Sequence, residues 1–203
     1  MPGQVAVRRE AKVAAIVAKA WELADQEGVA TLSLHALARA VGMRQPSLYE
    51  YFDSKHALYD AMFADGNRQL LTHLDALRLP RDPRSALKTQ LRAFATFALE
   101  RPSRYELLFL RHLPGFTPTP DAYALAQEVL GRIVALMHGA GVTRQADVDC
   151  LVAVIAGLID AQLSNEPTTS RWVRHIDRLT DLVVEDAIAR NALGTTTHRN
   201  EQP

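Results

Sequence analysis

The segment from Ser33 to Phe52, SLHALARAVGMRQPSLYEYF, constrains the fold more than any other part of the chain. Counted from Leu34 as position one, apolar residues fall at positions four, eight, ten and fifteen, with a small residue at five and a glycine at nine. Two short helices that cross at a steep angle need this pattern, because the small Ala38 lets them approach and Gly42 can adopt the positive φ that ends the first helix. The segment is therefore predicted to be a helix-turn-helix motif, the arrangement with which many proteins read DNA.

The spacing of apolar residues predicts helices along almost the whole chain, and no segment shows sustained alternation with a period of two. We expect an all-α fold of about nine helices, with a loop at the proline-rich segment 114–120 and a disordered tail at 195–203. Gly66 falls inside the expected fourth helix, where it indicates a soft point or a close contact. The expected helix boundaries are an end at Gly28 and starts at Ser33, Arg44, Asp53-Ser54, Asp82-Pro83, Pro102, Thr119-Pro120, Thr143 and Thr168–Ser170.

Composition excludes several classes of protein. Of the 203 residues, 48% are hydrophobic and 23% charged, which is typical of a globular protein with a substantial core. No apolar run approaches the roughly 18 residues of a membrane span, and the N-terminus lacks the apolar stretch of a secretory signal. Cys150 is the only cysteine, so an intramolecular disulfide is excluded, as expected for a cytoplasmic protein. We expect Cys150 to be an ordinary buried thiol, with a redox role as the alternative.

The charge balance does not by itself point to nucleic acid. The formal net charge is +0, and residues 1–55 hold seven Lys or Arg against six Asp or Glu. The positions of the charges say more, because Arg8, Arg9 and Lys12 lie at the start of the first expected helix, where the helix dipole disfavours cations. A nearby anion would explain this placement, and a solvated charged helix end is the alternative.

The last two long helices are too apolar to have only one buried face. Between Val148 and Leu163 apolar residues cover most of the circumference, and the segment after Trp172 carries a second broad apolar stripe. Such helices are buried on two sides, and the second side most simply faces another copy of the chain in a four-helix interface. A central core helix in a monomer is the alternative. The residues predicted for the dimer interface are Leu151, Ile155, Leu158, Trp172, Ile176, Leu179 and Val183.

Residues 9–60 resemble the N-terminal domain of the TetR (tetracycline-repressor) family of bacterial transcriptional regulators. The string GMRQPSLYEYFDSKHAL contains that family's glycine turn, its Leu-Tyr-x-x-Phe element and the Ser-Lys pair that opens the fourth helix. The resemblance implies a homodimer that places one recognition helix per subunit in the major groove of a palindromic double-stranded operator. It also implies a C-terminal domain that binds a small-molecule effector and thereby lowers DNA affinity. The expected domains are a DNA-binding domain at 1–54 and an effector-binding and dimerisation domain at 55–194. No cofactor, metal or membrane is expected. Repression is expected rather than activation only because members of this family are usually repressors.

On the helix-turn-helix interpretation, the first residues of the recognition helix face the base edges. Arg44 offers two parallel donors to guanine O6 and N7, and Gln45 can pair with adenine N6 and N7. Pro46 costs no helical hydrogen bond in the first turn and can present an apolar surface to a thymine methyl group. These three residues are the predicted base-reading set; the alternative is a solvated helix start without contacts.

A second set of residues is expected to position the protein on the phosphates. They carry hydroxyl groups, an imidazole or a charge on the motif or just after it, where members of the family that the segment resembles hold phosphates: Ser33, His35, Ser47, Tyr49, Tyr51 and Lys55. Tyr51 departs from the commoner histidine at its position, although a phenol can still donate. His35 could equally be an unengaged surface histidine. Leu48 and Phe52 are predicted to be core residues.

The C-terminal half concentrates aromatic residues that could line an effector pocket, although such a stripe is more often simply core. Asp160 interrupts an apolar run, where a carboxylate without a partner would be costly, so it is expected to pair with an arginine or to bind a polar ligand group. The predicted effector pocket comprises Phe94, Phe97, Tyr105, Phe109, His112, Asp160 and Gln162.

Two other classes of function fit the sequence less well. An enzyme is disfavoured because the seven histidines are scattered and the chain lacks HExxH, CxxC, G-x-S-x-G and phosphate-binding glycine motifs. A metal near His138, Asp147 and Asp149 is also disfavoured, because acidic residues near a helix start are routine caps. The main alternative is a small-molecule or lipid-binding protein of the same fold that does not act through DNA. Such a protein would not need Arg44, Gln45 and Lys55 together.

Overall fold

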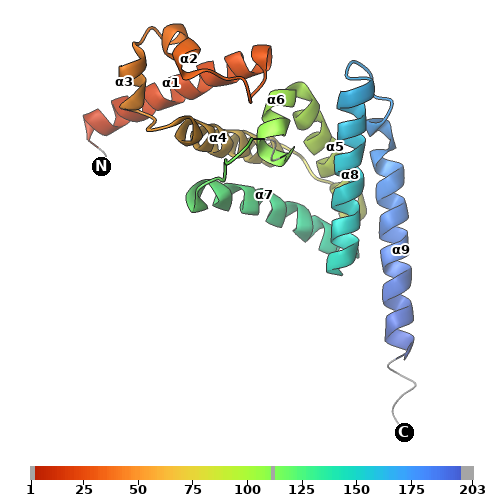
Figure 1. Ribbon diagram of the computed structural model, residues 1–203. Coiled ribbons are helices and arrows are strands. Elements are labelled where there is room, and N and C mark those ends of the chain that lie inside the picture. The colour runs from red at the N-terminus through yellow and green to blue at the C-terminus, as the bar shows by residue number, and fades with distance from the viewer. Residues whose placement is uncertain (1–2, 111–112, 198–203) are drawn as a thin grey trace. The chain divides into compact units, whose positions relative to one another are not determined.

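The computed structural model describes residues 3–110 and 113–197, except for the side chains of 193–197, and this part of the chain is all-helical, as predicted. Its nine α-helices are shown in Figure 1: α1 (Gln4–Glu27), α2 (Leu34–Ala40), α3 (Gln45–Tyr49), α4 (Lys55–Asp75), α5 (Pro83–Glu100), α6 (Pro102–Tyr105), α7 (Pro120–Gly139), α8 (Gln145–Asn165) and α9 (Ile176–Thr197). A π-helical turn, η1 (Glu106–Leu110), follows α6, and a 3-10 turn, η2 (Val173–His175), precedes α9. None of the described helices is long and apolar enough to cross a membrane.

The chain divides into two compact units, which are described separately. Unit 1 consists of Met1–Leu71 and Arg101–Gln127, and unit 2 of Thr72–Glu100 and Glu128–Pro203. Helices α4 and α7 therefore contribute residues to both units. The functional boundary expected after residue 54 is a different division and stays a prediction.

The local signals read from the sequence of unit 1 operate as expected. Helix α1 ends at Gly28, which has a φ of 89°. The hydroxyl of Ser33 accepts a hydrogen bond from the Ala36 amide at 3.4 Å and caps α2, and the hydroxyl of Ser54 accepts one from the Ala57 amide at 3.1 Å. These caps satisfy amides that have no partner within a helix.

The core of unit 1 lies where α1, α2, α3 and the first half of α4 meet. Its largest fully buried side chains include Ile16, Trp21, Leu37, Leu48, Leu58 and Met62. The indole Nε1 of Trp21 donates to Asp65 Oδ2 of α4 at 2.9 Å, so α1 and α4 are also joined by a hydrogen bond. Of the two roles expected for Gly66, a soft point or a close contact, the structure shows the close contact. A Cβ atom at this position would lie 3.2 Å from the Leu108 side chain.

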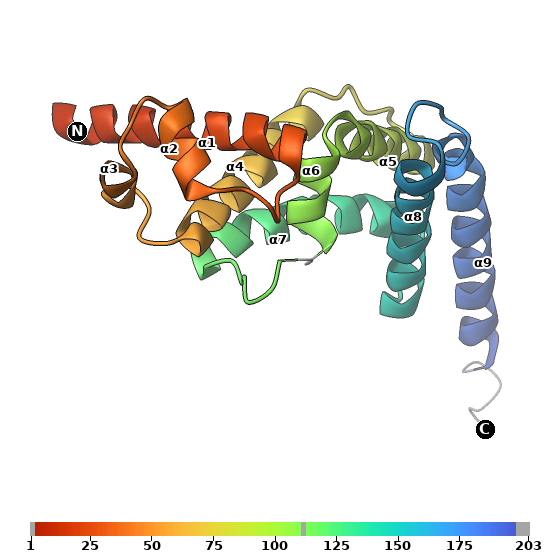
Figure 2. The same cartoon turned by 45° about the horizontal axis from the view of Figure 1, so that its top comes forward.

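Unit 2 contains α5, α8 and α9, with α8 and α9 running side by side (Figures 1 and 2). Arg84 and Lys88 of α5 form ion pairs with Asp181 of α9, at 2.6 and 2.5 Å. Asp82 caps α5 by accepting from the Ser85 amide at 2.8 Å, and hydrogen bonding to Ser85 lowers the pKa of this carboxyl. The expectation of a buried Cys150 is wrong: its thiol is exposed, because it lies on a face of α8 that does not pack into unit 2.

Two helix starts in unit 2 differ from the prediction. Helix α8 begins at Gln145, two residues after the expected start at Thr143, and Arg144 makes no side-chain cap. Helix α9 begins only at Ile176, since the preceding segment 166–173 is folded as a turn around the side chain of Gln162. At its other end α9 continues to Thr197, three residues into the expected disordered tail, and residues 198–203 lie outside the described part of the chain.

Candidate nucleic-acid interface

The turn between α2 and α3 has the geometry that the glycine pattern predicted. Gly42 has a φ of 68°, its amide donates to the Arg39 carbonyl at 3.1 Å, and the Met43 amide donates to the Ala38 carbonyl at 2.8 Å. A residue with a Cβ atom would be strained in this left-handed conformation. The turn therefore ends α2 abruptly and leads the chain directly into α3.

The predicted base-reading residues lie together at the amino-terminal end of α3. Arg44 is the N-cap residue, with extended backbone angles, and Gln45 and Pro46 are the first two helical residues. Arg44 and Pro46 are exposed and Gln45 is half-buried. This end of the helix therefore presents a guanidinium fork, an amide and an apolar ring within one turn, which is the chemistry needed to read base edges.

Helix α3 is held in unit 1 by one buried side chain. It is only five residues long, and Leu48 is its single buried residue, with 1% of its surface exposed. Phe52, just after the helix, is buried as well. Both residues were predicted to be core, and both predictions are confirmed.

The residues expected to contact phosphates occupy different environments. Ser33 uses its hydroxyl to cap α2, whereas His35 and Tyr49 are exposed, Tyr49 by 44%. Ser47 and Tyr51 are half-buried. Their contacts with DNA remain predictions.

Lys55 has partners within the protein that the sequence did not reveal. Its ammonium group donates to the Ala30 carbonyl at 3.0 Å and lies 5.3 Å from the centre of the Tyr59 ring. The side chain thus fastens the loop before α2 to the start of α4. A contact between Lys55 and a phosphate would have to compete with these interactions.

Arg9 is the residue of this region whose contacts sequence reasoning missed. Its Nη2 atom donates to the Glu50 carbonyl at the end of α3, at 3.0 Å, and its guanidinium carbon lies 5.5 Å from the centre of the Tyr51 ring. The only signal was the basic cluster at the start of α1. It suggested an external anion, and no local pattern links residues 41 positions apart.

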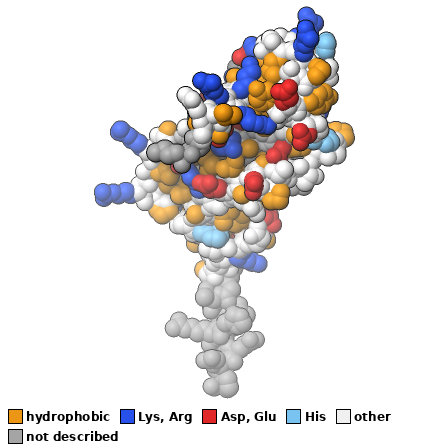
Figure 3. Space-filling model, turned by 90° about the vertical axis from the view of Figure 1, so that its left-hand side faces the viewer, with side chains coloured by type: hydrophobic (Ala, Val, Ile, Leu, Met, Phe, Trp, Pro, Cys, Tyr) orange, Lys and Arg blue, Asp and Glu red, His pale blue; other side chains and the backbone are white. Residues whose placement is uncertain are grey.

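The surface of the described residues does not carry one continuous basic patch on the face that Figure 3 shows. Lys and Arg side chains project there singly, among hydrophobic and acidic ones. This distribution agrees with a formal net charge of +0. Attraction to DNA would therefore depend on a few placed cations rather than on the overall charge.

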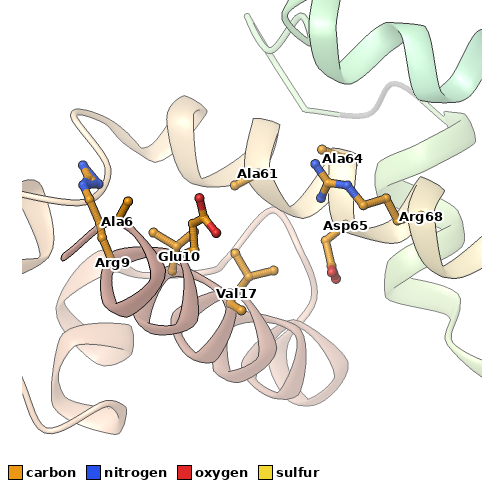
Figure 4. Close-up of a pocket in the computed structure, with 10 residues that line it drawn as sticks. Ala6, Arg9, Glu10, Val17, Ala61, Ala64, Asp65 and Arg68 are labelled. Carbon is orange, nitrogen blue, oxygen red and sulfur yellow. The ribbon is translucent and has the colours of Figure 1, made fainter. Parts of the chain in front are cut away.

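Unit 1 also contains an open pocket of about 560 Å³ between α1 and α4 (Figure 4). In Figure 4 the Glu10 side chain points from α1 toward Ala61 of α4. None of the predicted effector residues lines this pocket, whose walls are formed by Ala6, Arg9, Glu10, Val13, Ala14, Val17, Ala61, Ala64, Asp65 and Arg68.

The predicted effector residues are distributed over both units. Tyr105 and Phe109 belong to unit 1, where their rings are 5.4 Å apart, and Tyr105 is buried. Phe94 and Phe97 belong to α5 in unit 2, where the Phe97 ring lies 5.7 Å from that of His73. His112 lies outside the described residues.

Gln162 does not have the free hydrogen-bonding groups that an effector anchor needs. Its Oε1 accepts from the Trp172 and Val173 amides, at 2.8 and 3.4 Å, and its Nε2 donates to the carbonyls of Glu166 and Thr169. A side-chain amide has two acceptor sites and two donors, so its capacity is used. Gln162 is a structural residue, and its expected role as a ligand anchor is not supported.

Asp160 lies on the exposed side of α8. A carboxylate requires a strong partner or ligand only where burial removes it from water. For the exposed Asp160 the cost of desolvation is small, so burial gives no reason to expect an effector contact at this residue.

Four of the seven residues predicted for the dimer interface are already buried within unit 2 of a single chain: Leu151, Ile155, Leu158 and Ile176. A second copy could not reach them without opening the core. Trp172, Leu179 and Val183 are half-buried. The apolar residues of α8 and α9 that are open to a partner include Val152, Leu182 and Ile188.

Two family models match the chain. Residues 16–62 match the model described as bacterial regulatory proteins, tetR family, and residues 87–187 match the tetracyclin repressor-like C-terminal domain. The first match contains α2, α3 and the turn between them. The second contains most of α5, all of α6, α7 and α8, and about half of α9.

Relatives and solved structures agree with these models. The chain is 34% identical over 96 residues to YobS, an uncharacterised HTH-type transcriptional regulator of Bacillus subtilis, covering 47% of this chain and 50% of the relative. It is 32% identical over 136 residues to the HTH-type transcriptional regulator Rv1816 of Mycobacterium tuberculosis, covering 63% of this chain and 58% of the relative. The matched regions thus span less than two thirds of these relatives. The fold is similar to that of BioQ, which was solved with its double-stranded DNA operator. The TM-score is 0.60 at 19% identity, and the match covers 87% of this chain and 98% of BioQ.

Proposed function

The chain belongs to the tetR family of bacterial regulatory proteins, and on this premise we propose that it regulates transcription by binding a palindromic DNA operator as a homodimer. This family consists of regulators and not of enzymes. A bacterial regulator must reach the chromosome, so the proposal places the protein in the cytoplasm.

One observation carries the proposal: Arg44, Gln45 and Pro46 form the amino-terminal end of α3, directly after the turn at Gly42. A recognition helix reads DNA with the side chains at this end. The similarity in fold to BioQ, whose structure holds a double-stranded operator, supports the same use of α3 here.

The proposed homodimer is supported by the surface of α8 and α9. Leu182 on α9 is 51% exposed, and Val152 and Ile188 are almost as open. Ala153 and Gly157 lie exposed on α8, where small residues allow another helix to approach closely. Covering these side chains with a second copy would remove apolar surface from water, which favours association.

We further propose that the protein is a repressor released by a small-molecule effector. The match to a tetracyclin repressor-like C-terminal domain supports this part of the proposal. Release requires that the effector bind more tightly to a dimer whose recognition helices have the wrong spacing for the operator. Helix α4 is the physical link, because it begins directly after the motif and contributes residues to both units.

The test is selection of duplex DNA from a random pool by the full chain and by Gln45→Ala. We expect the wild-type protein to enrich a palindrome, since two identical subunits read two identical half-sites. Gln45→Ala should lose discrimination at one position of each half-site, by about 1–3 kcal/mol. The matched control is Gln127→Ala, which makes the same change at an exposed position of α7.

The outcomes separate the proposal from its rival. A palindrome that degrades in Gln45→Ala and not in Gln127→Ala supports operator binding through α3. If a folded dimer, freed of bound ligand by refolding, enriches no sequence, the protein is instead a ligand-binding member of the fold that does not act through DNA.

A further inference from the structure

We propose that Arg9 is a positioning residue for the recognition helix: its guanidinium group, extending from α1, holds the carboxyl-terminal end of α3. Arg44 and Gln45, at the other end of α3, then meet the DNA in one orientation. This inference rests on the proposed function. Arg9 acts through α3 and is not itself expected to touch DNA.

The contacts of Arg9 converge on the end of α3. Its Nη2 atom donates to the carbonyl of Glu50, the C-cap residue, at 3.0 Å. The guanidinium carbon lies 5.5 Å from the centre of the Tyr51 ring, within the range of a cation–π interaction. One side chain of α1 therefore binds both residues that follow the recognition helix.

Helix α3 needs such a support because it cannot be rigid by itself. It has five residues, far fewer than the roughly 12–15 at which an isolated helix becomes marginally stable. Leu48 anchors it at one point, and a single anchor leaves rotation about that point open. The last carbonyls of a helix lack partners within the helix and carry partial negative charge, so a guanidinium there satisfies one of them and stabilises the dipole.

The position of Arg9 in α1 fits a structural role better than a phosphate contact. Guanidinium groups that bind phosphate usually present their fork to it, whereas this fork is directed at a carbonyl and a ring of the protein. The neighbouring Arg8 is exposed, and the described residues provide it with no hydrogen bond or ion pair. Arg8 therefore serves as a control of equal charge in the same turn.

The experiment measures operator affinity over a series of salt concentrations for the wild type, Arg9→Ala, Arg9→Lys and Arg8→Ala. The slope of log K against log salt counts the phosphates that the protein neutralises. We expect Arg9→Ala to bind about tenfold more weakly with an unchanged slope, because hydrogen bonds to charged groups are worth more than neutral ones. Arg9→Lys should recover only part of the loss, since an ammonium group has no planar fork to place on both partners.

Two results would overturn the proposal. One is a slope reduced by about one per subunit in Arg9→Ala, with full recovery in Arg9→Lys, which would make Arg9 a phosphate contact. The other is a loss of operator affinity in Arg8→Ala equal to that in Arg9→Ala, which would show that the positive charge of this turn matters and not the contacts of Arg9.

Hydrogen exchange gives a second readout that does not depend on DNA. The amides of Tyr51 and Phe52 donate to the Leu48 carbonyl, at 3.0 and 3.1 Å, and report whether the end of α3 is closed. They should exchange about tenfold faster in Arg9→Ala than in Arg8→Ala, because local opening costs less once the support is lost. Equal exchange in the two variants refutes the positioning role. If the wild type selects no operator, the proposed function fails, while these amides still decide whether Arg9 holds α3.

Discussion

Two short segments, one in each unit, depend on a single buried side chain, but the chemistry of the two anchors is opposite. In unit 1, α3 is fixed by Leu48, which contributes apolar surface. In unit 2, the segment 166–173 between α8 and α9 is fixed by Gln162, whose amide bonds to four backbone groups. The comparison shows that a locally irregular chain can be ordered either by hydrophobic burial or by satisfying its backbone.

The two anchors also differ in how their removal lowers the stability of the protein. Removing apolar surface weakens packing in proportion to the area and the cavity left behind. Removing the amide instead leaves partly buried donors and acceptors without partners, and each of these costs free energy on its own. Substitutions at the two positions can therefore distinguish the mechanisms.

The largest effect is expected for Leu48→Ala in unit 1. The loss of a fully buried leucine should lower the free energy of unfolding by about 3 kcal/mol. The buried Trp21 reports on unit 1, so urea unfolding followed by tryptophan fluorescence in a Trp172→Phe background measures the change. Specific DNA binding should fall with it, because α3 loses its only core contact.

Val7→Ala is the control, since Val7 lies on α1 in the same unit as Trp21 and is 51% exposed. It should change the free energy of unfolding by less than about 0.5 kcal/mol. Equal losses for the two variants would mean that Leu48 is not the anchor of α3.

The second effect concerns Gln162→Met, which keeps the size of the side chain and removes its hydrogen bonds. The amides of Trp172 and Val173 and the Thr169 carbonyl lose their partner, so the free energy of unfolding should fall by about 2 kcal/mol. Exchange of these two amides should accelerate more than exchange in α8. Hydrogen-exchange mass spectrometry together with urea unfolding measures both.

Gln90 offers a control of the same residue type in the same unit. It is buried on α5, and its Nε2 atom has no hydrogen-bond partner. Gln90→Met should therefore be neutral or slightly stabilising. A similar loss in both variants would show that burial of a long side chain, and not the hydrogen bonds of Gln162, holds the segment.

These anchors explain why the sequence predicted the motif so closely. The signals at Ser33, Gly42, Leu48 and Ser54 each act over a few residues, through a cap, a turn or one face of a helix. Such signals can be read one at a time. The contact of Arg9 with Glu50 could not be read in this way, because it joins residues 41 positions apart that no local pattern relates.

In unit 2 the sequence predicted the helices but not their faces. Helix α8 is apolar around most of its circumference, so periodicity could not tell Leu151, which is buried, from Val152, which is exposed. A polar residue in such a helix was likewise ambiguous. Its pattern predicts a ligand anchor at Gln162, whereas the partners of this side chain are backbone groups 4 to 11 residues further along the chain.

The smallest effect tests a third kind of contact, the ion pairs between α5 and α9. Hydrogen bonding from Lys88, with a further contribution from Arg84, lowers the pKa of Asp181 below its ordinary value of 3.8. A carboxyl whose pKa is lowered by folding stabilises the protein above the unfolded value, and this contribution is lost as the pH falls through the lower folded value. Asp181→Asn should therefore be less stable than the wild type at neutral pH, and the difference should vanish in acid.

The side chains involved are partly exposed, so the expected difference at neutral pH is below about 1 kcal/mol. A double-mutant cycle with Lys88→Met isolates the pair, and its coupling energy should be present at pH 7 and disappear below the folded pKa. Coupling that persists in acid would assign the contact to packing of the lysine stem rather than to charge. In that case α5 and α9, like α3, would be held by apolar surface. The segment around Gln162 would then be the one of these three that is held by hydrogen bonds.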